Sequence, residues 1–106
     1  MSYRFMRVIV FFDLPVVSRR DRLEYSRFRR RLIKSGFVMM QESVYTKLAL
    51  NSAVASSVCE EVRRIKPPKG LVQMLTVTEK QFSKMEMVVG DYKSNVLSTD
   101  ERTVIL

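Results

Sequence analysis

The sequence lacks histidine and tryptophan altogether, and it has one cysteine and three glycines among 106 residues. Without histidine, the chain is missing the side chain that most often acts as a general base and as a zinc ligand. Cys59 has no partner in the chain for a disulfide or a thiolate metal cluster, so we predict that it is a small buried apolar residue. Three glycines also do not allow a glycine-rich phosphate-binding loop. Any chemistry must therefore come from carboxylates and basic side chains.

Long apolar runs are also missing. The apolar stretch near the N-terminus covers residues 5–12, and Arg7 interrupts it. A membrane-spanning helix needs about 20 apolar residues, so we expect no membrane segment, no signal peptide and a cytoplasmic protein. The length fits one domain with one hydrophobic core.

Positive charge is in excess. The chain has 19 Lys and Arg against 11 Asp and Glu, a formal net charge of +8 and a pI near 10.1. This balance favours polyanionic partners such as nucleic acids. From composition alone, a basic protein without any nucleic-acid role is the alternative.

The first strand is predicted over residues 5–12, which are rich in valine, isoleucine and phenylalanine. Side chains alternate between the two faces of a strand, and one face here is wholly apolar and belongs in the core. The other face carries Arg7, Ile9, Phe11 and Asp13. Because Ile9 and Phe11 are too apolar to stay in water, we expect another chain or a terminal segment to cover this second face.

A basic helix is predicted next. Ser18 and Asp21 have the spacing of a helix start, and Gly36 favours an end near Ser35. Asp21 and Glu24 are its only acids against eight bases, and such an excess repels itself unless an anion binds. A solvated charged surface is the alternative. The residues predicted to bind nucleic-acid phosphates are Arg19, Arg20, Arg27, Arg30, Arg31 and Lys34.

The remaining elements complete a strand-helix-strand-strand-helix-strand order. Residues 37–48 are strand with a break near Gln41, either a hairpin or one bent strand, and a second helix begins at Asn51 or Ser52. Residues 66–70 end that helix, a strand follows at 71–78, then a turn or short helix at 79–84 and a strand at 85–89. The order predicts an α+β ferredoxin-like fold, with two helices on one sheet face.

We divide the chain into a ferredoxin-like domain, residues 1–90, and a C-terminal extension, residues 91–106. The extension is mostly polar but ends in the apolar residues 103–106. It is either a frayed tail or an edge strand added to a sheet, where it would contact a dimer partner or another protein.

Asp13 is the candidate metal ligand and catalytic residue. It ends the first strand, before Leu14 and Pro15, and a turn-forming role is the alternative. One carboxylate alone binds magnesium poorly. A two-fold homodimer that paired the open sheet faces would bring two copies of Asp13 near one axis, where they and a bound phosphate could hold Mg²⁺ or Mn²⁺.

These features also occur together in a known family. Residues 12–15 (Phe-Asp-Leu-Pro) precede the basic helix, Gly36 and residues 41–45 (Gln-Glu-Ser-Val-Tyr) follow it, and residues 67–70 (Pro-Pro-Lys-Gly), 71–78 and 81–82 come later. In order and spacing, roughly residues 3–90 resemble the CRISPR-associated Cas2 family, with most similarity to members found beside a Cas9 effector.

The resemblance implies a ferredoxin-like homodimer with facing sheets. It implies a subunit of spacer acquisition that bridges two dimers of the Cas1 integrase and holds double-stranded DNA for insertion into a CRISPR array. It also implies metal-dependent endonuclease activity on RNA or DNA, with Asp13 at the position of the family's proposed metal ligand. In one departure, arginines stand at positions 19, 20 and 22, where the family often has other polar groups.

A different function class is also open. Stand-alone RNA-binding modules on this fold stack bases on aromatic residues of the open sheet face. Phe5 and Phe11 could serve in this way here, but Ile9 lies between them. Burial in a dimer is the simpler use of that face.

Overall fold

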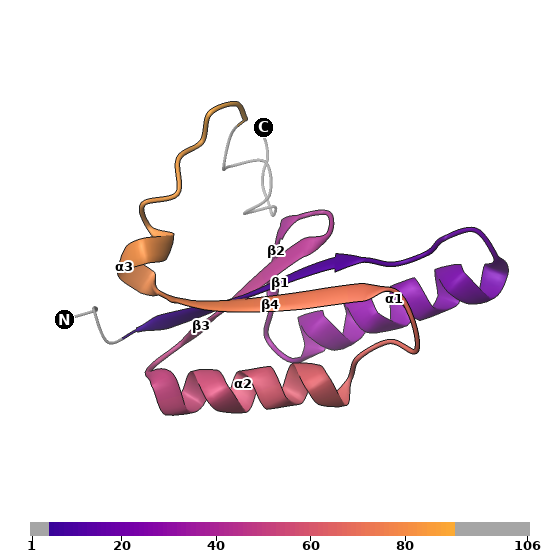
Figure 1. Ribbon diagram of the computed structural model, residues 1–106, viewed down its shortest axis with the longest axis horizontal. Helices are drawn as coiled ribbons and strands as arrows, with labels where there is room; N and C mark the ends of the chain where they lie inside the picture. The colour runs from indigo at the N-terminus through magenta and orange to yellow at the C-terminus, as the bar shows by residue number, and fades with distance from the viewer. Residues whose placement is uncertain (1–4, 91–106) are drawn as a thin grey trace.

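The computed structural model of the protein describes residues 5–90. The predicted extension at 91–106, including its terminal strand, lies outside this range. The elements, shown in Figure 1, are β1 (Met6–Asp13), α1 (Arg19–Lys34), β2 (Val38–Gln41), β3 (Val44–Ala49), α2 (Ser52–Arg64), β4 (Leu71–Thr78) and α3 (Glu79–Phe82).

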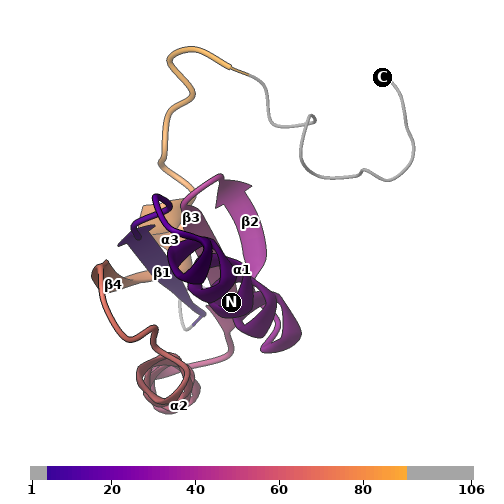
Figure 2. The ribbon, with the colours of Figure 1, turned by 90° about the vertical axis from the view of Figure 1, so that its right-hand side faces the viewer.

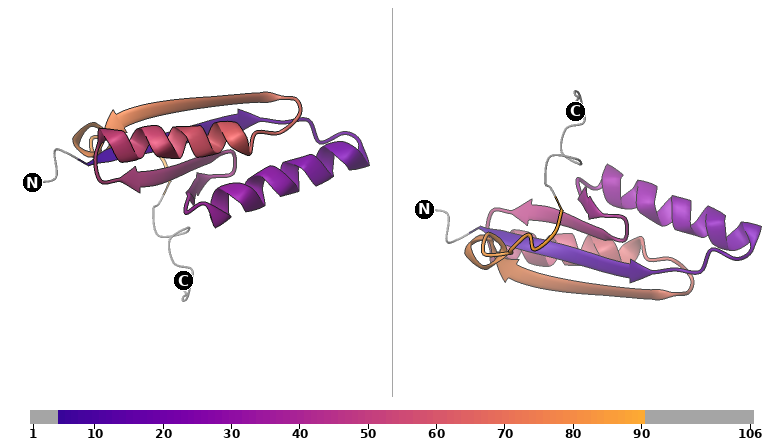
Figure 3. Two further views of the ribbon diagram at one scale, coloured as in Figure 1. Left: turned by 90° about the horizontal axis from the view of Figure 1, so that it is seen from below. Right: turned by 90° about the horizontal axis from the view of Figure 1, so that it is seen from above.

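The four strands form one antiparallel sheet in the order β2-β3-β1-β4, so β1 lies inside the sheet. Both long helices lie on one side of it, and Figure 3 shows α2 in front of the strands from below and behind them from above. This arrangement confirms the predicted α+β ferredoxin-like fold. The break near Gln41 is the turn of a β2–β3 hairpin, with a register irregularity between Met39 and Gln41, which settles the choice left open by the sequence.

The core lies between the sheet and the helices. Alternation along β1 places Val8, Val10 and Phe12 in the core, as predicted. Phe12 contacts three aromatic rings there: its centroid lies 5.3 Å from Phe28, 5.9 Å from Tyr25 and 5.7 Å from Tyr45. These contacts fasten the end of β1 to α1 and β3, so they fix the position of Asp13.

The helices begin and end near the predicted residues. Ser18 caps α1 in a capping box with Asp21, and Ser35 follows its last residue. Asn51, and not Ser52, caps α2 through its side chain. Cys59 is a free cysteine that packs against the core, as predicted, but it is only partly buried, and its sulfur lies 3.6 Å from the Thr76 hydroxyl.

The second face of the sheet is largely apolar, as the β1 pattern predicts. Strand register places Leu75 of β4 beside Ile9, and Leu48 of β3 beside Arg7. Ile9 is 5% exposed, but Phe11, Leu48 and Leu75 are 37%, 43% and 52% exposed. The two long helices, α1 and α2, leave this face uncovered.

A short helix is fastened to one end of this face. Arg7 donates two hydrogen bonds to the Glu79 carboxylate, at 2.9 and 2.6 Å, and its guanidinium lies 4.4 Å from the centre of the Phe82 ring. The backbone amide of Glu79 also donates to the carbonyl of Phe5. Arg7, a charged residue on an otherwise largely apolar face, therefore holds α3 in place.

The strand predicted at residues 85–89 is wrong for the described structure. None of the described strands pairs with this segment, and a strand needs a hydrogen-bonded neighbour. Met87, Val88 and Val89 are exposed instead. In Figure 2 the segment leaves α3 on the side away from α2.

Gly70, the residue before β4, should be essential for the close packing of the 66–70 loop against the end of β1. It has φ of +102°, and a Cβ there would lie 2.6 Å from Leu14 Cδ2 and 3.2 Å from the Asp13 carbonyl oxygen. We predict that Gly70→Ala lowers the free energy of unfolding by about 1–3 kcal/mol, measured by chemical denaturation. Gly90→Ala is the matched control, because Gly90 has φ of +116° but no atom of residues 5–90 within 4 Å of an added Cβ. Equal losses of stability in both variants would contradict a role for the packing against Leu14.

Candidate nucleic-acid and metal site

Asp13 is the exposed last residue of β1 and lies opposite Leu71, the first residue of β4. No hydrogen bond or ion pair within residues 5–90 involves its carboxylate. The same residues contain no group of three or more His, Cys, Asp or Glu that could hold a metal ion. Asp13 thus fits the role of a single ligand to Mg²⁺, an ion that keeps several waters and is often bound by one or two carboxylates plus substrate phosphates.

Asp21 is fully engaged at the start of α1. Its amide donates a hydrogen bond to the Ser18 hydroxyl at 3.0 Å, and its carboxylate accepts one from the Ser18 amide at 3.2 Å. The other carboxylate oxygen lies 3.3 Å from Lys69 Nζ. The hydrogen bond from the Ser18 backbone, aided by Lys69, holds the pKa of Asp21 below its usual value. Asp21 is therefore a structural carboxylate, whose charge is used by the helix cap and by Lys69.

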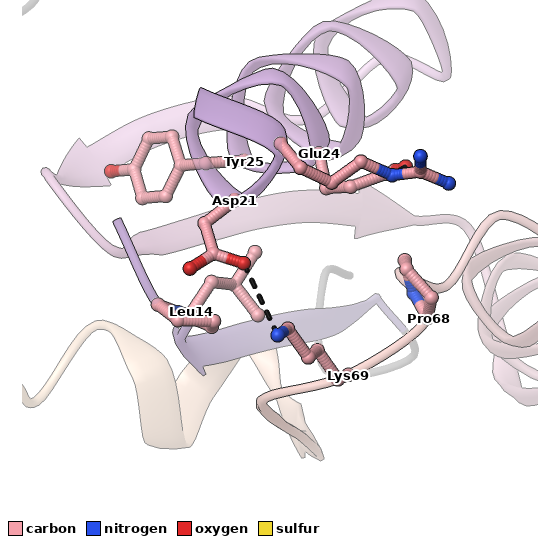
Figure 4. Close-up of a pocket in the computed structure, with 8 residues that line it drawn as sticks. Leu14, Asp21, Glu24, Tyr25, Pro68 and Lys69 are labelled. Atoms are coloured by element: carbon pink, nitrogen blue, oxygen red, sulfur yellow. Dashed lines mark ion pairs between the residues drawn. The ribbon is translucent and has the colours of Figure 1, made fainter. Parts of the chain in front are cut away.

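A pocket lies between the N-terminal half of α1 and the 66–70 loop, beside the turn that follows β1. Its apolar lining comes from Leu14, Pro15, Pro68 and the ring of Tyr25. Figure 4 shows Lys69 reaching from the loop to Asp21 across this pocket. The charged lining residues are Arg20, Asp21, Glu24 and Lys69.

Sequence reasoning missed this pocket. The sequence pattern explained residues 66–70 as the end of the second helix, and residues 67–70 as part of the family resemblance. The available signal was Gly70, whose positive φ lets the loop pass close to Leu14.

The predicted basic face of α1 exists. All six of its proposed phosphate-binding residues are exposed: Arg19, Arg20, Arg27, Arg30, Arg31 and Lys34. Arg20 and Arg27 lie 3.8 and 3.5 Å from Glu24, within reach of a weak ion pair. Within the described residues, Arg30 and Arg31 make no ion pair. Their charges are available to an anion.

Two shallow grooves extend this basic surface. Arg27, Arg30, Arg31 and Lys34 line one groove with Ile33. Lys47 lines the next groove with Arg31 and Lys34, and its Nζ donates to the Ser35 carbonyl at 2.6 Å. Lys47 was not predicted, because it lies on β3 and only the folded sheet brings it beside the end of α1.

Two further arginines of α1 serve the fold. Arg22 donates to the carbonyls of Val16 and Val17 and so holds the β1–α1 loop. Arg29 lies beside the buried hydroxyl of Tyr45. Burial raises the pKa of Tyr45, and the charge of Arg29 partly offsets that rise.

Comparison with known proteins identifies the family of this fold. The family model for CRISPR associated protein Cas2 matches residues 6–85, from β1 through α3. The chain belongs to the Cas2 family. This result confirms the resemblance found in the sequence.

Several relatives of this Cas2-family chain have been named. A Treponema denticola protein is 56% identical over 101 residues, which is 95% of this chain and all of the relative. Lacticaseibacillus rhamnosus has a relative 42% identical with the same coverage. A Campylobacter jejuni protein is 41% identical over 97% of this chain and 72% of its own length. Each is named CRISPR-associated endoribonuclease Cas2. Separately, none of the helices within residues 5–90 is long and apolar enough to span a membrane.

The charge of Asp21 should make folding of this Cas2-family chain pH dependent. A carboxylate whose pKa is lowered in the folded state stabilises the fold above its unfolded pKa, near 3.9, and this contribution is lost as the pH falls through the folded pKa. We predict that Asp21→Asn lowers the melting temperature at neutral pH and that the difference from the unaltered protein shrinks as the pH falls below the unfolded pKa of about 3.9 and through the lower folded pKa.

Lys69→Met is the companion variant, because it removes the ion pair but leaves the capping box. It should reproduce only part of the neutral-pH loss. If the difference in melting temperature between Asp21→Asn and the unaltered protein does not change with pH, the loss of stability comes from the altered shape of the side chain and not from the loss of its charge.

Proposed function

We propose that the protein is the adaptation subunit of a CRISPR system, a homodimer that binds double-stranded DNA and bridges dimers of the Cas1 integrase. A metal-dependent endonuclease activity at Asp13 is the finer part of the proposal. The observation that carries the proposed DNA binding is the exposed basic face of α1, in a chain that belongs to the Cas2 family. Arg30 and Arg31 on this face make no ion pair within the described structure. Phosphates are the ligands that such a surface selects.

The uncovered sheet face supports the homodimer. Phe11, Leu48 and Leu75 are large apolar groups left between 37% and 52% exposed. A second copy of the same face would bury them, and a specific pair would remove roughly 1,200–2,000 Å² from water. Because Asp13 ends β1 on this face, a two-fold axis through the paired sheets would bring two copies of its carboxylate together.

The chemistry proposed for Asp13 requires a cation. Bound Mg²⁺ or Mn²⁺ would supply Lewis-acid polarisation of the phosphoryl group and a more acidic water. The carboxylate of Asp13 would hold that ion, and the arginines of α1 would bind the flanking phosphates and orient the strand. The sequence has no histidine, so no imidazole is available as a general base.

RNA cleavage is the second candidate activity, because the relatives are named endoribonucleases. It would use the same carboxylate and the same cations on a single strand. A stand-alone RNA-binding module is the non-enzymatic alternative. Only Phe11 supports it directly, since it is the exposed aromatic residue on the described strands of the open face.

The arginine face should give salt-sensitive, sequence-tolerant binding of duplex DNA. We predict that replacing Arg27, Arg30 and Arg31 with alanine lowers affinity for all duplex sequences alike. The slope of log affinity against log salt should flatten by roughly 0.9 for each phosphate that the variant no longer neutralises. Fluorescence anisotropy over a salt series measures both quantities.

The matched control removes the same number of charges elsewhere. Arg63, Lys80 and Lys84 are exposed on other parts of the chain, and their replacement with alanine should weaken binding less. Equal loss of affinity in both triple variants would mean that net charge alone drives binding. Unchanged binding after the α1 replacements would make that face a solvated surface, and Lys66, Lys69 and Lys93 would be tested next.

Asp13 should be required for any cleavage but not for the fold. We predict that Asp13→Ala and Asp13→Asn abolish divalent-metal-dependent cleavage of RNA or DNA. Both variants should keep duplex binding and the mass of two chains by light scattering, since the side chain is exposed at a strand end. Glu42→Gln, an exposed acid near the β2–β3 turn, is the control and should cleave normally. Full cleavage by Asp13→Asn, or in excess EDTA, would exclude this mechanism.

A further inference from the structure

The positive charges at the N-terminal end of α1 are partly neutralised by neighbouring acids. Both acids of the helix, Asp21 and Glu24, lie in its first two turns. Lys69 is paired with Asp21, as Figure 4 shows. Glu24 lies 3.8 Å from Arg20 and 3.5 Å from Arg27. A phosphate at this end of the helix would have to compete with these carboxylates for the cations.

The C-terminal end of α1 carries cations without such partners. Arg31 and Lys34 make no ion pair within residues 5–90. They line a groove of about 450 Å³ together with Lys47 of β3, and we call this the Lys47 groove. The other residues that line it are Ser35, Glu61 and Ile65. The carboxylate of Glu61 is already paired with Arg64, so the positive charges of the groove are left for an anion.

Lys47 is held in place before any ligand binds. Its Nζ donates to the carbonyl of Ser35 at 2.6 Å, and its side chain passes over Gly36, where an added Cβ would lie 3.2 Å from Lys47 Cε. An ammonium group has three N–H donors, so two remain for an anion. The hydrogen bond to Ser35 also offsets the partial negative charge at the C-terminal end of α1, which would otherwise repel an anion. A cation fixed in this way loses less side-chain entropy on binding than a free surface lysine.

We propose that the Lys47 groove holds a phosphate group of the bound nucleic acid, so that the duplex runs over the C-terminal end of α1 toward β3 and α2. The inference rests on the proposed DNA binding and adds to it the path of the strand. A phosphate group fits this groove because its oxygens accept from several N–H donors at once. The guanidinium of Arg31 and the ammonium groups of Lys34 and Lys47 supply those donors from two different elements.

The Lys47 groove continues the arginine face of α1. Arg31 and Lys34 also line the neighbouring groove, whose other residues are Arg27, Arg30 and Ile33. No acid lines that neighbouring groove. Residues 27–34 span about 10 Å of helix, the rise of about three base pairs, so a backbone that follows them meets successive phosphates before it reaches Lys47. The arginines at the start of α1 then contribute less to binding than those in its second half.

Variants at the two ends of α1 test this path. Lys47→Met removes the charge and keeps the apolar stem. We expect it to weaken binding of a duplex of about 20 base pairs roughly tenfold and to flatten the slope of log affinity against log salt by about 0.9, the loss of one phosphate contact. Lys69→Met removes one charge at the N-terminal end and is the matched control, with an expected loss of less than about twofold. Fluorescence anisotropy over a salt series, in EDTA, measures both quantities.

Two further variants separate the charge of Lys47 from its hydrogen bond to Ser35. Lys34→Met removes an exposed charge that makes no hydrogen bond within residues 5–90, and it should flatten the salt slope without lowering the melting temperature. Lys47→Arg keeps a positive charge with several donors and should restore the salt slope of the unaltered protein. Melting curves establish that each variant is folded.

The source of the phosphate is tested separately, because free anions carry the same group. Inorganic pyrophosphate is titrated into the unaltered protein and into Lys47→Met by calorimetry. If pyrophosphate binding depends on Lys47 while Lys47→Met leaves the duplex affinity and the salt slope unchanged, the groove is a site for a free phosphate compound and the proposed path is overturned. Loss of duplex affinity in Lys47→Met supports the path whether or not pyrophosphate binds.

The outcomes distinguish this inference from the proposed function. Flattened slopes in Lys47→Met and Lys34→Met, with little change in Lys69→Met, support the path over the C-terminal end of α1. Equal losses in all three variants mean that net charge alone drives binding, and a larger loss in Lys69→Met places the duplex at the other end of the helix, so either result overturns the path. Absence of duplex binding by the unaltered protein would overturn the proposed function itself.

Discussion

Phe12 packs its ring against Phe28 and Tyr25 of α1 and against Tyr45 of β3, with centroid distances between 5.3 and 5.9 Å. Because neighbouring residues of a strand point to opposite faces, the inward position of Phe12 forces Asp13 outward at the strand end. The same contacts seat α1 on the sheet with its apolar stripe inward and its arginines in solvent. The buried ring of Phe12 thus fixes where the carboxylate of Asp13 lies relative to the arginines of α1.

The protein separates its charge and its apolar surface between opposite sides. The arginine face of α1 lies on the helical side, while the exposed apolar groups of β1, β3 and β4 lie on the other. Two charged residues of β1 also lie on the apolar side: Asp13 at the strand end, and Arg7, whose charge is matched by the carboxylate of Glu79 and the ring of Phe82. A second copy could therefore cover the sheet without covering the arginines, so dimer formation and phosphate binding need not compete.

The elements that local rules determine were predictable from the sequence. Ser18 with Asp21 marks the start of α1, and β4 follows from its run of β-branched and apolar residues, as both patterns depend on neighbours in the chain. Lys47 in the basic groove and Lys69 on Asp21 were not predictable, because they depend on which strands and loops become neighbours in space. The predicted strand at residues 85–89 failed for a related reason. Its residues suit a strand, but a strand exists only where another edge accepts its hydrogen bonds.

Asp13 and Asp21 show how environment divides the work of two identical side chains. Asp21 is buried, capped by Ser18 and paired with Lys69, so its negative charge is already used by the fold. Asp13 is exposed and has no such partner among the described residues, so its charge is available. One available carboxylate binds Mg²⁺ weakly, and the remaining ligands must be water, substrate phosphate or a second copy of Asp13. Tight metal binding at Asp13 would then depend on substrate or on the dimer, which couples any cleavage to assembly on nucleic acid.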